Sequence, residues 1–107
     1  MDEAEIEFLR ARLDETGKLA RAYLDHAIAR KRPGPERWGY AQVLREVQAQ
    51  QLILERYERA RTIPESAVSF TAGQDDGYRQ ACEDALRDFN AIYSDHPDYR
   101  PEWKAAA

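Results

Sequence analysis

Two histidines and one cysteine are the side chains best suited to acid–base, nucleophilic or metal-binding chemistry in this sequence. His26 and His96 lie 70 positions apart, and neither has a second histidine or cysteine three or four residues away to complete a metal pair. Cys82 is separated from His96 by a helix and a turn, and it lies in an apolar helical pattern typical of a small buried side chain. We therefore expect no catalytic residue, no metal and no cofactor, and hence a protein that is not an enzyme.

A basic corner is the first candidate binding feature. Arg30, Lys31, Arg32 and Arg37 occur close together beside two aromatic residues, Trp38 and Tyr40. Such a cluster can bind phosphate or an acidic protein surface. The alternative is that these charges complement the dipole of a helix end, which is common at the corners of helical bundles.

The stretch from Tyr93 to Trp103 is the second candidate. Asp95-His96-Pro97-Asp98 is typical of a turn that ends a helix, and Tyr99 and Trp103 are large apolar side chains with polar handles. These aromatic residues either dock on the protein's own bundle or anchor a partner. Together the two features give the predicted partner-binding residues: Arg30, Arg32, Arg37, Trp38, Tyr40, His96, Tyr99, Arg100 and Trp103.

Three amphipathic helices are expected to position these residues. Apolar residues recur every three, four or seven positions, which predicts helices over 2–31, 37–62 and 75–93, a loop over 63–74 and a tail over 94–107. Asp2 and Glu5 resemble a capping box at the start of the first helix. Gly17 interrupts the first apolar stripe, so either the helix breaks there or another backbone passes close by.

The length and pattern predict a single all-α domain over 1–107, an antiparallel three-helix bundle with two long helices, a shorter third helix and an extended C-terminal tail. The third helix is too short to cover the whole hairpin made by the first two. Because large exposed apolar patches are uncommon on monomers, the uncovered end predicts a protein partner and specifically suggests a homodimer.

The charge composition narrows the class of partner. The formal net charge is -4 at pH 7, which disfavours nucleic-acid binding overall, although a local basic patch can override the total. No apolar run approaches the roughly 18 residues of a membrane span, and the acidic start is unlike a signal peptide. We expect a cytoplasmic protein that does not bind membranes.

Several motifs, in order along the chain, carry a resemblance to a known family. They are Phe8-Leu-Arg-Ala-Arg-Leu-Asp-Glu15, Val43-Leu-Arg-Glu-Val47, Gly77-Tyr78, Glu83-Asp-Ala-Leu-Arg87 and the stretch from Tyr93 to Trp103. The chain resembles a family of small proteins from actinobacteria and their phages that is classed as a domain of unknown function. Members of that family typically have an insertion after the first helix and a His-Ile-Ala-Arg-x-Asp-Pro run, where this chain has only Arg37-Trp38-Gly39-Tyr40. Because the activity of the family is unknown, the resemblance assigns no site residue.

The leading functional hypothesis is a non-enzymatic helical protein-interaction module whose contact surface includes the basic corner and the tail. The alternative is a nucleic-acid-associated regulator that uses the corner around residues 30–40.

Overall fold

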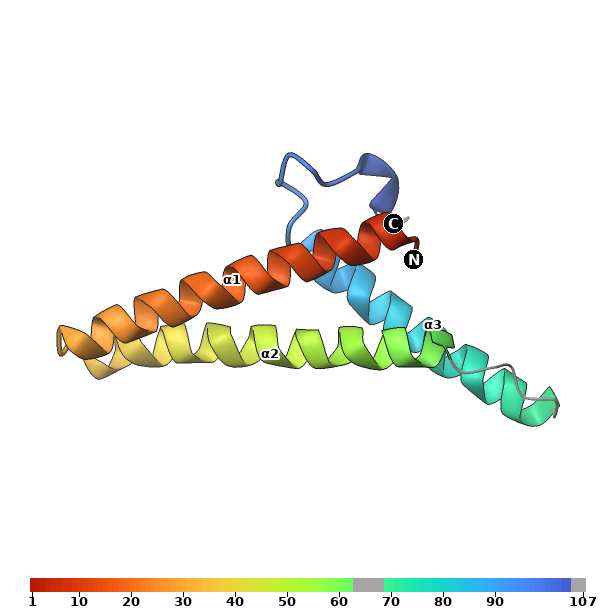
Figure 1. Cartoon of the computed structure of the whole chain (residues 1–107), viewed down its shortest axis with the longest axis horizontal. Helices are drawn as coiled ribbons and strands as arrows, with labels where there is room; N and C mark the ends of the chain where they lie inside the picture. The colour runs from red at the N-terminus through yellow and green to blue at the C-terminus, as the bar shows by residue number, and fades with distance from the viewer. Residues whose placement is uncertain (63–68, 105–107) are drawn as a thin grey trace.

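The fold consists of three α-helices and one short 3-10 helix. The computed structural model describes the backbone of residues 1–62 and 69–104, and the side chains of 1–62 and 76–104. The helices are α1 (Glu3–Ala29), α2 (Gly34–Thr62), α3 (Ser69–Ala91) and the 3-10 helix η1 (Pro101–Trp103). α1 and α2 form a long antiparallel hairpin, and α3 returns obliquely across the end that holds the N-terminus (Figure 1). The predicted all-α three-helix bundle is confirmed.

Both ends of α1 follow local backbone chemistry. The Asp2 side chain accepts a hydrogen bond from the Glu5 N–H at 2.8 Å, as expected for an N-cap. At the other end Lys31 has a φ of 52°, and the Arg32 N–H donates to the Ala27 carbonyl at 2.9 Å. This is a Schellman arrangement, in which the residue with positive φ is usually glycine. α1 therefore ends at Ala29, slightly before the predicted boundary.

The other boundaries differ more from the sequence-based prediction. α2 begins at Gly34 rather than at residue 37, because prolines such as Pro35 fit the first turn of a helix, where no N–H partner is needed. α3 begins at Ser69 rather than at residue 75, so the second half of the expected loop over 63–74 is helical. The first half of that loop lies outside the described residues. The tail contains turns and η1, and is not uniformly extended.

α1 continues through Gly17 without a break. A Cβ placed on this residue would lie 3.4 Å from Val47 Cγ1, so a side chain of α2 fills the space beside the glycine. Gly17 thus marks a close contact between the two long helices. The neighbour is a side chain, not the crossing backbone that was one of the two expectations.

The hydrophobic core lies in the half of the hairpin that α3 covers. Its buried members come from all three helices: Ile6, Leu9 and Leu13 from α1, Val47, Leu54 and Tyr57 from α2, and Leu86 from α3. Burying one such side chain contributes roughly 1.5–3 kcal/mol. The predicted apolar faces are confirmed at these positions. The same helical periodicity predicts burial of Val43, Tyr78, Ala81 and Ile92. This prediction is wrong, because α3 crosses the hairpin and does not lie along it, and all four are exposed.

The molecule is consequently elongated. Its longest extent is 58 Å and its radius of gyration is 17.1 Å, against about 13 Å for a compact domain of this length. The extra length has two sources: the end of the hairpin that projects beyond α3, and the N-terminal part of α3, which projects beyond the opposite end of the hairpin (Figure 1).

Gly17 gives a prediction about the hairpin contact. Gly17→Ala should raise the free energy of unfolding by about 0.5–1 kcal/mol, because alanine is the better helix former and its Cβ meets Val47 at an ordinary contact distance. Gly17→Leu should lower it by roughly 1–3 kcal/mol, because the longer side chain must displace the Val47 side chain or move out of the contact between the two helices. Urea unfolding measures both effects. The control is Gly39→Ala, at a helical position with open space around it, and a Gly17→Leu variant as stable as this control would contradict the close contact.

Candidate protein-interaction surface

The hairpin loses the cover of α3 near Thr16. Here the Thr16 and Tyr93 hydroxyls lie 3.2 Å apart and form a hydrogen bond, and α3 has ended two residues earlier, at Ala91. The chain then turns back over α1 toward its N-terminal end (Figure 1). From this level to the connection between α1 and α2, the two helices pack only against each other among the described residues.

An apolar strip occupies the uncovered side. Leu19 and Tyr23 of α1 are 51% and 54% exposed, and the Tyr23 ring stacks on that of Tyr40 of α2 with 5.5 Å between centroids and 18° between planes. Val43, one turn beyond Tyr40, is also exposed. We call Leu19, Tyr23, Tyr40 and Val43 the open face.

Helical spacing places the open face on the same side of the hairpin as α3. Leu19 and Tyr23 follow Thr16, which binds the end of α3, at steps of three and four residues. On α2, Val43 lies fourteen residues before Tyr57, whose hydroxyl donates to Glu83 of α3 at 3.4 Å, and two heptads return to nearly the same side of a helix. The open face is therefore the continuation of the surface on which α3 packs.

The basic corner forms the tip of the hairpin. Residues 30–40 contain four basic side chains and one acidic side chain, a formal net charge of +3. Arg32 forms an ion pair with Glu36 at 2.9 Å, and Arg30 and Arg37 are exposed. Trp38 is 68% exposed and lies over Gly34, with 3.0 Å between its Cζ2 and a Cβ built there. The tip thus combines positive charge with an exposed aromatic ring.

The tail packs on the protein's own α1. Phe8 lies at the centre, with ring centroids 5.5 Å from His96, 5.9 Å from Tyr99 and 5.2 Å from Trp103. Trp103, in η1, is only 5% exposed. We call this cluster the tail clasp. These aromatic residues therefore dock on the protein's own bundle, which was one of the two alternatives predicted from the sequence.

His96 takes part in the clasp through both ring nitrogens. Its Nδ1 accepts a hydrogen bond from the Asp98 N–H at 3.1 Å, and the Arg12 guanidinium contacts its Nε2. Arg12 also lies over the Phe8 ring, 5.4 Å from the centroid, and pairs with Glu15 at 3.3 Å. Both nitrogens of this histidine are therefore occupied by structural contacts within the chain.

The nine predicted partner-binding residues consequently fall into two separate groups. Arg30, at the tip, lies 22 residues along α1 from Phe8, at the clasp, which is about 33 Å of helix. Arg100 stays exposed, with its guanidinium 5.3 Å from the centre of the Trp103 ring. Of the open face, the sequence prediction included only Tyr40. Leu19 and Tyr23, four residues apart beside the main apolar stripe, were the signal for it.

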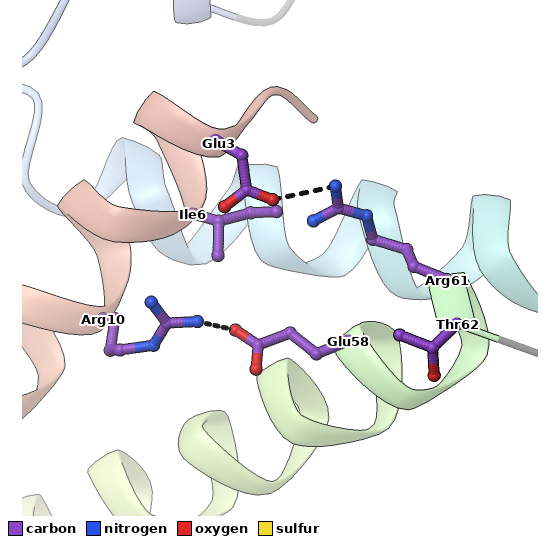
Figure 2. Close-up of a pocket in the computed structure, with 6 residues that line it drawn as sticks. All are labelled: Glu3, Ile6, Arg10, Glu58, Arg61 and Thr62. Atoms are coloured by element: carbon purple, nitrogen blue, oxygen red, sulfur yellow. Dashed lines mark hydrogen bonds and ion pairs between the residues drawn. The ribbon is translucent and has the colours of Figure 1, made fainter.

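The clefts near the covered end are lined by charges that pair with one another. A cleft of about 330 Å³ between α1 and α2 contains the ion pairs Arg10–Glu58 and Glu3–Arg61, the second at 2.9 Å (Figure 2). Both pairs join the two helices and brace the hairpin. Among the described residues, no group of three or more His, Cys, Asp and Glu side chains is arranged to hold a metal ion.

A half-buried polar cluster joins the three helices behind the core. The Glu83 carboxylate of α3 accepts from the Met1 amine and the Tyr57 hydroxyl, and pairs with Arg87 at 2.8 Å. Burial acts to raise the pKa of Glu83, but the hydrogen bond and charge of the amine, together with Arg87, outweigh it and hold this pKa below its ordinary value. Burial raises the pKa of Glu5, and Arg87 only partly offsets this effect. The Glu83 carboxylate is thus favoured in its ionised form.

The tail clasp gives a stability prediction with an internal control. Trp103→Ala should lower the free energy of unfolding by about 3 kcal/mol, since it removes a large buried ring from the contact with Phe8. Trp38→Ala should change it by less than about 0.5 kcal/mol, because that ring is mostly in solvent. Urea unfolding followed by circular dichroism measures both. Equal losses for the two tryptophans would contradict the clasp.

The Glu83 cluster gives a prediction about pH. A carboxylate whose folded-state pKa is lowered contributes stability above its unfolded pKa and loses it as the pH falls through the folded value. Glu83→Gln should therefore cost roughly 1–3 kcal/mol at pH 7, and this cost should shrink as the pH falls below 4.5, the ordinary value. The free energy of unfolding, measured as a function of pH on protein with a free Met1 amine, tests this prediction. The control is Asp84→Asn, at an exposed neighbour, and a Glu83→Gln cost that does not depend on pH would refute the prediction.

No described helix has the length and apolar character needed to cross a membrane.

In a comparison with known protein families, the model of a family of unknown function, DUF6221, matches residues 2–105. No curated protein and no solved structure matches. Because the match spans nearly the whole sequence, the chain belongs to the DUF6221 family of unknown function.

Proposed function

We propose that this chain is a non-enzymatic protein-interaction module and that it binds its partner through the projecting half of the α1–α2 hairpin. The observation that carries the proposal is the open face. It continues the surface on which α3 packs, and three of its four side chains, Leu19, Tyr23 and Val43, are exposed. A stacked tyrosine pair with flanking aliphatic side chains is the type of surface that binds another helix, because burial of such side chains drives association.

The tip supplies the second part of the proposed surface. Its positive charge and the exposed Trp38 ring suit an acidic partner, since aromatic and arginine side chains dominate binding hot spots. Lys31 supports this assignment. It has the positive φ that normally favours glycine, so the tip carries a charge at some cost in stability.

The tail residues belong to the fold in this proposal. His96, Tyr99 and Trp103 are engaged with Phe8, and their removal is expected to act on stability first and on binding only indirectly. The setting implied by the family resemblance is the cytoplasm of an actinobacterium or of a cell infected by its phage.

Site-specific photo-cross-linking tests the surface. p-Benzoylphenylalanine in place of Tyr23 should give a protein adduct of defined mass in cells that carry the gene. The same amino acid in place of Arg21 should give little adduct, because Arg21 is exposed on the opposite side of α1, where it lines a shallow groove together with Asp14, Lys18 and Asp25. Equal yields at the two positions, or no adduct at Tyr23, would contradict the proposal.

A nucleic-acid-associated regulator is the second candidate, and the local charge of the tip favours it. Retention on a DNA column that falls steeply with salt and is abolished by Arg32→Glu with Arg37→Glu would establish it. If these substitutions do not change the retention, the tip does not bind DNA.

A further inference from the structure

The open face is bounded at both ends. Tyr93, two residues after the end of α3, closes one end at Thr16, and the connection after Ala29 closes the other at Arg30. The open stretch of α1 is therefore fourteen residues, about 21 Å long. A partner must present an apolar helical surface of this length, and the open face of a second copy of the chain does so.

The position of Tyr23 favours a symmetric arrangement. Tyr23 lies midway between Thr16 and Arg30 along α1. If a twofold axis passes near Tyr23 and the hairpins run antiparallel, the tip of one copy reaches the level at which α3 of the other copy ends. A twofold interface uses the same patch on both copies. The end of α3 in each copy therefore limits how far the tip of the other copy extends, and this sets the register of the two hairpins at both ends.

The charges at the two ends of the open face are opposite. The tip, residues 30–40, has a formal net charge of +3. At the other end, the turn that follows α3 carries two exposed aspartates, Asp95 and Asp98, a formal net charge of -2 over residues 92–98 with His96 neutral. We call this turn the acidic end of α3. An antiparallel pair brings opposite charges together at both ends, whereas a parallel pair would place the two basic tips side by side.

An exposed apolar side chain lies at one of these ends. Ile92, one residue after α3, is 64% exposed. The antiparallel arrangement brings Ile92 of one copy to the level of the tip of the other.

From these observations we propose that the partner on the open face is a second copy of this chain, docked antiparallel about an axis near Tyr23, with the basic tip of each copy against the acidic end of α3 in the other. This inference rests on the proposed function and names the partner of the same surface.

Complementary charge reversal tests the orientation directly. One variant carries Arg30→Glu and Arg37→Glu at the tip, and a second carries Asp95→Lys and Asp98→Lys at the acidic end. Sedimentation equilibrium on the full chain should give twice 12.4 kDa for the wild type. Each variant alone should dimerise at least about tenfold more weakly, because like charges meet at both ends. An equimolar mixture should recover the wild-type affinity, because the mixed pair has opposite charges at both ends.

Three results would overturn the proposal: a wild-type mass near 12.4 kDa at all concentrations, variants that dimerise like the wild type, or a mixture that recovers no affinity. Circular dichroism of each variant excludes unfolding as the cause, and Lys31→Gly provides a further check. It removes one tip charge while relieving the positive φ, so it should raise the thermal midpoint and still weaken the dimer.

The cross-link at Tyr23 separates this inference from the proposed function. An adduct with a different protein and none with a second copy would refute the dimer and retain the interaction module.

Discussion

α3 ends at Ala91, beside Thr16, whereas α1 continues to Ala29 and α2 begins at Gly34. α3 crosses the hairpin at an oblique angle and covers only the half of it that holds the core. In the other half α1 buries the small side chains of Ala20 and Ala27, and the outer side of the hairpin faces solvent. The open face and the accessible basic tip both follow from this oblique crossing.

The covered half is reinforced by contacts that tie distant parts of the sequence together. The tail returns over α1 and buries Trp103 against Phe8, while Glu83 joins the Met1 amine, α2 and α3. Ion pairs between α1 and α2 add to this bracing. The chain thus concentrates its stabilising interactions at one end and leaves the other end supported by the hairpin alone. A partner on the open face would supply there the burial that α3 supplies at the core.

Much of the fold was predictable from local pattern. Ile6, Leu9 and Leu13 recur at helical spacing, and Asp2 caps the helix that carries them, so α1 and its buried side follow from the sequence. The crossing angle of α3 was not predictable, because it depends on packing between residues far apart in the sequence. For this reason Val43 and Ile92 looked like core residues and are exposed. The candidate site was predicted in part: the basic tip is accessible, the tail aromatics pack within the chain, and an uncovered end of the hairpin was expected. Of the side chains on the open face, only Tyr40 was among the predicted binding residues.

Amide hydrogen exchange at several protein concentrations tests the central claim most directly, because it compares the two halves of one helix. The account predicts that residues 17–29 of α1 exchange faster than residues 6–16 in dilute solution, and that their protection rises with concentration as the open face is covered. Residues 6–16 serve as the internal reference. Equal protection along α1 that does not change with concentration would contradict the claim that the projecting half of the hairpin is an unfilled contact surface.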